Sequence, residues 1–306
     1  MRVFLTGAGG YIGSAVARRL RGDGHEVVAL TRDARKAAKM GERGLIPVVG
    51  DMKEPRTWRR EADVCEALIH LGFEYGPHAA EADRRATAAL LASSRAARFP
   101  RLLIYTSGAW VLGPARGIPA GEDARVNPPE IVNWRPAVED WVLSFAGDGL
   151  SVAVIRPGVV YGESGGLYGM MIQALLTERE IRLAGGGENR WASVYLDDLV
   201  DLYALALEHR PRRSVYHATD GASEPVRAAA DALALAAGGG DVLDWPLAQA
   251  RLAMGSLADA LAMDQSVTSE KARRELGWRP KVVSAAGHAE DLLAQWEAKV
   301  SPPCVA

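Results

Sequence analysis

The sequence of 306 residues predicts an α/β fold built on a doubly wound parallel sheet, and three observations support this prediction. The first fourteen residues, MRVFLTGAGGYIGS, place a short apolar run directly before a glycine-rich turn. Up to about residue 156, short β-branched runs alternate with longer helical stretches, which is the pattern of βαβ units. Beyond 185–187, alanine-rich stretches indicate a smaller, mainly helical C-terminal lobe.

The opening segment predicts a buried strand, a turn and a helix in direct succession. Residues 3–5 form an apolar run too short for a helix. Ile12, Val16 and Leu20 recur every fourth residue and therefore share one face of a helix. The N-terminus of that helix would point free N–H groups at a phosphate. The turn between them contains Gly7, Gly9, Gly10 and Gly13, in which Gly7, Gly10 and Gly13 follow GxxGxxG spacing. Together these features predict a Rossmann-type dinucleotide site.

The remaining elements follow from periodicity and turn residues. We expect strands near 2–6, 26–31, 45–49, 66–71, 101–106 and 151–156, with helices at Asp33–Met40 and Pro77–Phe99. The second half predicts helices near 197–208, 224–237, 247–262 and 284–299, with a short strand at Val215–His217. This order predicts a dinucleotide-binding domain over 1–160, to which the chain returns around 190–217, and a mainly substrate-binding lobe over 161–306.

Composition restricts the class of protein. The sequence is 48% apolar and 24% charged, and its net charge of −2 comes from interspersed acids and bases. Neither nucleic acid nor a membrane is therefore an expected partner. Cys65 and Cys304 lie far apart without ligand spacing, which predicts neither a structural metal nor a disulfide framework. We expect a cytoplasmic protein, because the N-terminus begins the first strand and no apolar run reaches membrane-spanning length.

Separated motifs in the same order resemble the extended short-chain dehydrogenase/reductase family. TGAGGYIG, from Thr6 to Gly13, looks like the family's TGxxGxxG motif. RPGVVYG at 156–162 is similar to its RPxxVYG segment, and VYLDDL at 194–199 resembles its HVxD element. Residues 269–280 resemble its C-terminal KAxxELGWxP segment. The resemblance covers nearly the whole chain and implies a dinucleotide-dependent enzyme.

This resemblance assigns the cofactor contacts residue by residue. Asp51 looks like the aspartate that contacts adenine, and His70-Leu71-Gly72 looks like the end of the fourth strand beside the nicotinamide ribose. The cofactor-binding residues expected from the motifs are Gly7, Gly9, Gly10, Tyr11, Ile12, Gly13, Arg32, Asp51, Met52, Leu71, Gly72, Phe73, Thr106, Pro157, Gly158 and Val160.

The end of the second strand favours NADP over NAD. An NAD site has an acidic residue about 20 positions beyond the glycines, which binds the adenine ribose hydroxyl. That place holds Thr31 and Arg32 here. A guanidinium is suited to a 2′-phosphate, and Arg35 and Lys36 add positive charge. Asp33 next to them keeps NAD as the alternative.

The family's catalytic Tyr-x-x-x-Lys pair is missing, because residues 107–150 contain neither tyrosine nor lysine. One alignment places Trp134 at the tyrosine and Val138 at the lysine. A second alignment, anchored on Glu139, places Ile131 and Arg135 there instead. Neither supplies a phenol, and a tryptophan cannot act as a general acid near neutral pH.

Other side chains are candidates for the missing chemistry. Ser107 is the nearest hydroxyl in the segment that resembles SSxxVYG, with Gly108 at its second serine, and Tyr75 is the preferred substitute proton donor in the loop after the fourth strand. We expect Ser107 and Tyr75 to be catalytic and no metal to be bound. The expected substrate-binding residues are Trp110, Trp134, Tyr161 and Arg190. The two tryptophans suggest a flat or aromatic substrate rather than a sugar nucleotide.

The sequence therefore predicts an NADP(H)-binding oxidoreductase that acts on a small, aromatic carbonyl, imine or alcohol with a non-standard proton donor. One alternative is a redox-neutral cyclase, isomerase or lyase on the same scaffold. Another is a non-catalytic protein that senses NADP. The family resemblance implies a homodimer formed through the helices at about 78–98 and 130–147.

Overall fold

The computed structural model describes residues 1–74, 76–147 and 149–300. Contacts between residues divide the chain into two compact units. The first unit comprises Met1–Ser107, Trp134–Arg156 and Val200–Tyr216. The second contains Gly108–Asn133, Pro157–Leu199 and the chain from His217 onward. Among the described residues, no helix is long and apolar enough to cross a membrane.

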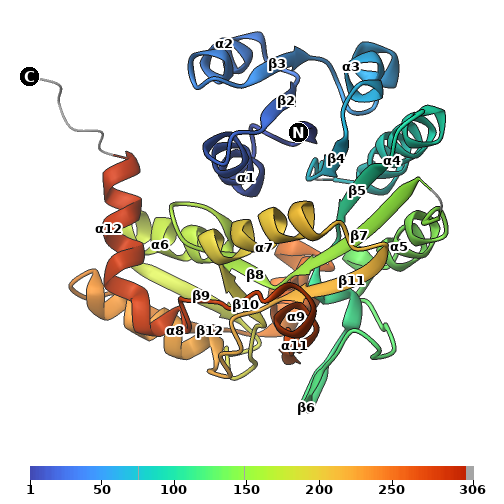
Figure 1. The fold of residues 1–306 in the computed structure, drawn as a ribbon. Helices are drawn as coiled ribbons and strands as arrows, with labels where there is room; N and C mark the ends of the chain where they lie inside the picture. The colour runs from blue at the N-terminus through green and yellow to red at the C-terminus, as the bar shows by residue number, and fades with distance from the viewer. Residues whose placement is uncertain (75, 148, 301–306) are drawn as a thin grey trace, which may run out of the picture. The chain divides into compact units, whose positions relative to one another are not determined.

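A seven-stranded sheet forms the centre of the first unit and confirms the α/β fold (Figure 1). Its order is β11-β7-β5-β4-β1-β2-β3, and the chain order reverses between β1 and β4. The pairs of β1 with β2 and β4, of β2 with β3, and of β5 with β4 and β7 are parallel. Its strands are β1 (Arg2–Thr6), β2 (Glu26–Thr31), β3 (Ile46–Val49), β4 (Ala67–His70), β5 (Arg101–Thr106), β7 (Leu150–Pro157) and β11 (Arg213–Ala218).

Helices connect these strands. They are α1 (Tyr11–Gly22), α2 (Ala34–Glu42), the short η1 (Pro55–Thr57), α3 (Arg59–Asp63), α4 (Ala79–Ala96), α5 (Arg135–Leu143) and α7 (Leu196–His209), whose residues from Val200 onward belong to this unit. Figure 1 shows α4 between α3 and α5, and it contacts both. The central strands bury both faces, as their almost continuous apolar runs require. Phe4 of β1 stacks on Trp58 with ring centroids 5.3 Å apart, and both side chains belong to the core of this unit.

The second unit combines helices with short parallel strand pairs rather than one large sheet. The pairs are β6 with β13, β8 with β10, and β9 with β12. Its strands are β6 (Ala115–Ala120), β8 (Val159–Tyr161), β9 (Glu180–Ala184), β10 (Ser193–Tyr195), β12 (Asp241–Trp245) and β13 (Gln265–Val267). Its helices are η2 (Ala109–Leu112), η3 (Glu130–Val132), α6 (Gly166–Glu178), α8 (Val226–Ala236), α9 (Leu247–Met254), α10 (Leu257–Leu261), α11 (Glu270–Leu276), η4 (Ala286–His288) and α12 (Ala289–Val300). Its main apolar core packs α6, α8 and α12 together with β8 and β9.

Candidate functional site

The glycine turn lies at the carboxyl end of β1, next to the point where the strand order reverses. Thr6 and His70 are register partners, so the turn after β1 meets the loop after β4. Gly7 has φ +73°, and a Cβ there would lie 2.6 Å from the carbonyl carbon of Leu71. A Cβ on Gly13 would run into the carbonyl oxygen of Gly7. The two backbones can therefore approach this closely only because glycine occupies both positions.

This turn leaves the N-terminus of α1 open to an anion. The helix begins at Tyr11 behind Gly10, which offers no side chain to cap the first amides. Gly9 and Gly10 are exposed, and the Gly10 amide bonds to the Gly7 carbonyl at 2.9 Å. Free amides and the positive end of a helix dipole together favour a phosphate. The residues present thus fit the pyrophosphate of a dinucleotide.

A buried polar network lies beneath the turn, and sequence reasoning missed it. The hydroxyl oxygen of Thr6 accepts hydrogen bonds from the amides of Leu71 and Gly72 at 3.1 and 3.0 Å. Its distance to Nδ1 of His70 is 2.7 Å. Because this oxygen already accepts two protons, a hydrogen bond between Thr6 and Nδ1 would use the hydroxyl's own proton.

The network continues from His70 toward α4. Nε2 of His70 lies 3.3 Å from Oδ1 of Asp83 without forming a hydrogen bond, and the Tyr105 hydroxyl donates to Oδ2 at 2.9 Å. All of these side chains are buried. Burial and the adjacent Asp83 carboxylate hold the pKa of Tyr105 well above its usual value, so Tyr105 remains a donor. The network therefore joins β1, β4, β5 and α4 below the turn.

At the carboxyl end of β2, the structure gives Asp33 and Arg32 different roles. Oδ1 of Asp33 accepts the amides of Arg35 and Lys36 at 2.7 and 3.3 Å, so this carboxylate caps α2. Arg32 has an exposed side chain, and its Nη1 lies 4.0 Å from Oδ2 of Asp51. Asp51 in turn accepts the Lys53 amide at 2.9 Å. Arg32 thus presents a guanidinium at the end of β2 whose ion pair with Asp51 is long.

The loop after β4 lies beside the same edge of the sheet. Sδ of Met52 would lie 2.9 Å from a Cβ on Gly72, so Met52 and Gly72 are in close proximity. Phe73 is 44% exposed, and Glu74 pairs with Lys53 at 3.0 Å. Tyr75, the expected proton donor, lies outside the described residues.

The carboxyl end of β5 brings Ser107 near the N-terminus of α5. The Ser107 amide donates to the carbonyl of Ile155 at 2.8 Å. Its hydroxyl is buried and has no hydrogen-bond partner among the described residues. Thr106 before it bonds through its hydroxyl to Tyr203 at 2.7 Å. The Ser107 hydroxyl is thus a buried polar group that is unsatisfied within the described chain.

Arg135, at the first position of α5, lies against the end of β5. Its Nη1 donates to the carbonyl of Thr106 at 3.1 Å. The guanidinium carbon lies 5.2 Å from the ring centroid of Phe73 and 4.7 Å from that of Trp134. One turn along α5, Glu139 forms a buried ion pair with Arg156, with Nε 3.1 Å from both carboxylate oxygens. Glu139 is thus engaged elsewhere, and Arg135 has aromatic neighbours instead.

The second unit contains further residues that the sequence places in the site. Gly158 packs so closely on Ala192 that a Cβ would lie 2.7 Å from its carbonyl carbon. Tyr161 is fully buried and donates to Asp220 at 2.8 Å. Arg190 binds Asp264 through Nε and Nη2, each at 2.9 Å. Val160 pairs with Val194 between β8 and β10, Trp110 packs against the main core, and Pro157 ends β7. The roles expected for these residues remain predictions.

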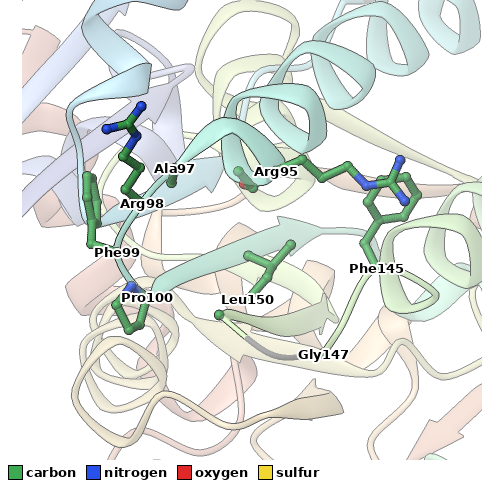
Figure 2. A pocket seen from close by; sticks show the side chains of 10 residues that line it. Arg95, Ala97, Arg98, Phe99, Pro100, Phe145, Gly147 and Leu150 are labelled. Atoms are coloured by element: carbon green, nitrogen blue, oxygen red, sulfur yellow. The ribbon is translucent and has the colours of Figure 1, made fainter.

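The described residues contain no group of three or more His, Cys, Asp or Glu side chains that could hold a metal ion. A pocket of about 530 Å³ lies at the amino ends of β5 and β7, around Pro100 and Leu150, with Arg95 placed over the ring of Phe145 (Figure 2). Because parallel strands share their direction, this pocket lies at the edge of the sheet opposite to Gly7.

Comparison with known proteins identifies relatives along the whole chain. The sequence model of the NAD dependent epimerase/dehydratase family matches residues 3–218. The uncharacterised protein YLL056C of Saccharomyces cerevisiae is 31% identical over 97% of this chain and 99% of its own length. A Stigmatella aurantiaca protein, 4-hydroxy-2-methyl-3-oxo-4-farnesyl-3,4-dihydroquinoline-1-oxide ketoreductase, is 28% identical over 94% of each chain.

Solved structures share the fold. The human epimerase family protein SDR39U1, crystallised with NADPH, superimposes with a TM-score of 0.78 at 20% identity, covering 96% of this chain and 99% of its own. Other structures of the same fold contain NAD.

Proposed function

Because this chain belongs to the NAD-dependent epimerase/dehydratase family, we propose that it is an oxidoreductase that uses NADP(H) to reduce the carbonyl or imine group of a small aromatic substrate. When bound, the cofactor supplies or accepts the hydride. The chain's own residues bind its phosphates, orient its ring and hold the substrate oxygen. A donor other than the family's tyrosine, Tyr75 or water, supplies the proton.

The capping role of Asp33 is the observation that supports NADP most directly. Oδ1 of Asp33 already accepts two helix amides, so capping of α2 accounts for this carboxylate and leaves only Oδ2 for a ribose hydroxyl. Arg32 next to it has an exposed side chain suited to a 2′-phosphate. A ketoreductase among the relatives supports carbonyl reduction.

Thermal unfolding tests the cofactor preference. NADPH should raise the melting temperature more than NADH at the same concentration, because tighter binding to the folded state gives greater stabilisation. Arg32→Ser should abolish this difference. Lys39→Ser, which removes an equally exposed positive charge from α2, should preserve it. Equal stabilisation of the wild-type protein by both cofactors would contradict the NADP preference.

The absent tyrosine and lysine between residues 107 and 150 favour a second candidate function, a redox-neutral enzyme or an NADP-sensing protein. NADPH absorbance separates the candidates. A reductase consumes NADPH when it is given an aromatic ketone or imine. A redox-neutral enzyme converts its substrate at constant absorbance, and a sensor binds NADPH without turnover.

A further inference from the structure

We propose that Arg135 and Ser107 form an oxyanion-binding site for a conjugated or aromatic ligand, so that Arg135 holds the negative charge on the substrate oxygen. This inference rests on the proposed function, because the anion arises there by reduction. The site belongs to the first unit, where the end of β5 meets the start of α5.

The first support is the hydrogen bonding of Arg135. A guanidinium carries five N–H donors, and among the described residues only the Thr106 carbonyl accepts one of them. Glu139, the carboxylate one turn along the helix, is bonded to Arg156. A half-buried cation without a carboxylate partner in the described chain attracts an anion. Arg190 in the second unit differs in this respect, because Asp264 binds it at two nitrogens.

The second support is the Ser107 hydroxyl, which is independent of the arginine. The residue is 8% exposed, and its oxygen has no hydrogen-bond partner in the part of the chain described. A buried hydroxyl without a partner is costly, so a ligand that accepts its proton would relieve that cost. Ser107 directly follows Thr106, whose carbonyl anchors Arg135. Both donors are therefore fixed to the same end of β5.

The surroundings indicate which class of anion fits. Phe73 and Trp134 both place a ring within cation–π distance of the guanidinium, which fixes its plane. Phe73 is also half-exposed and offers apolar surface beside the charge. The positive end of the α5 dipole starts at Arg135 and adds to the field. An oxyanion attached to an aromatic or conjugated group matches this combination better than a sugar hydroxyl does.

The proposed reduction balances without a tyrosine as the proton donor. When bound, NADPH would supply a hydride to the carbonyl carbon and become NADP⁺, and the π electron pair of the C=O bond would move to oxygen. Arg135 and Ser107 would hold the resulting alkoxide until it takes a proton from water. An arginine cannot give up its own proton near neutral pH, so it stabilises the charge without neutralising it.

Calorimetry with the full chain saturated with NADP⁺ tests this site, using benzoate as the anionic probe and benzamide as its neutral analogue. The wild-type protein should bind benzoate more tightly than benzamide. Arg135→Met keeps an apolar side chain but removes the charge, and it should weaken benzoate binding roughly 10- to 100-fold, with benzamide unaffected. Ser107→Ala should cause a smaller loss, and Arg135→Lys an intermediate one.

The matched control is Arg95→Met. Arg95 also lies over an aromatic ring, 4.5 Å from the centroid of Phe145, but at the opposite end of β5 (Figure 2). This variant should leave benzoate affinity unchanged. The affinity for NADP⁺ should be the same in every variant, which also confirms that each one folds.

Distinct results would overturn the inference. If the NADP⁺-loaded wild-type protein does not prefer benzoate, or if Arg135→Met retains that preference, the oxyanion site is wrong. If Arg135→Met weakens NADP⁺ binding instead, the guanidinium serves the cofactor. Failure of the wild-type protein to bind NADP⁺ at all contradicts the proposed function, which is a separate outcome.

Discussion

At the scale of single residues, Gly7 at the carboxyl end of β1 matters because it has no side chain. Gly7 combines a left-handed φ with a backbone approach that excludes a Cβ. The neighbouring contact is the backbone of Leu71, which cannot rotate away as a flexible side chain would. We therefore expect substitutions here to affect cofactor binding before they affect the rest of the fold.

Gly7→Ala tests this expectation. The left-handed conformation costs a residue with a Cβ about 1–2 kcal/mol, and the clash with Leu71 must also push the two loops apart. NADPH affinity, measured by fluorescence titration, should fall by roughly tenfold or more. The control is Gly41→Ala in α2, where a Cβ meets nothing within 4 Å. This substitution should stabilise the protein by about 0.4–1 kcal/mol. Unchanged NADPH affinity in Gly7→Ala would contradict the close-approach argument.

The sequence predicted the glycine turn but not the polar network beneath it, and sequence separation explains why. Glycine spacing is a local pattern, whereas Thr6 lies 64 positions from His70 and Tyr105 lies 22 positions from Asp83. Nothing near Asp83 distinguishes it from a solvated acid in a helix, yet it is buried against His70. Burial becomes apparent only when the strands are assembled.

At the scale of elements, α5 is attached to β7 through one buried ion pair. Nε of Arg156 lies 3.1 Å from Oε1 of Glu139, and Nη2 of Arg156 lies 2.5 Å from Oε2. Both residues are buried, so the charges have little water to replace a missing partner. This attachment also fixes the helix whose first residue is Arg135.

Glu139→Gln should therefore destabilise the protein strongly. Removing one charge from a buried pair typically costs about 3–5 kcal/mol, because the other charge stays buried. Urea unfolding measures this loss. Glu81→Gln breaks an exposed pair with Arg85 on α4 and should change stability by only about 0.3–0.5 kcal/mol. Similar losses in the two variants would show that Arg156 finds compensation elsewhere.

The central strands could be predicted because their runs of apolar residues are almost continuous. The elements of the second unit have weaker sequence patterns. The expected strands at 2–6, 26–31 and 101–106 coincide with β1, β2 and β5. In contrast, β12 is mostly exposed, and its sequence DVLDW contains only two consecutive apolar residues. The helix expected over 247–262 is two helices, because Gly255 has φ +59° and ends α9. Local breaks of this kind depend on tertiary context.

At the scale of the whole molecule, several buried thiol and phenol groups make the stability of the protein depend on pH under alkaline conditions. Burial raises the pKa of the Cys65 thiol to about 11. Burial likewise raises the pKa values of Tyr161, Tyr168 and Tyr203 above the usual range of tyrosine. These groups therefore keep their protons in the folded state at a pH where the unfolded chain releases them.

The sign of the resulting pH dependence follows from linkage. The folded state binds more protons than the unfolded state between the unfolded and folded pKa values, so stability falls as pH rises there. We expect the free energy of unfolding to decline from about pH 9 upward, when measured in urea. Tyr203→Phe removes one such group and should make the decline shallower. A stability that is constant or rises over this range would refute the prediction.

The glycine turn has a consequence for how this chain can change. The phosphate site proposed there consists of peptide groups, so replacing neighbouring side chains would leave it chemically intact. The reacting oxygen, in contrast, would be held by the Arg135 guanidinium and the Ser107 hydroxyl, which a single codon change can remove. Cofactor capture and reactivity can therefore diverge independently, and a lineage could exchange one chemistry for another while retaining the same coenzyme.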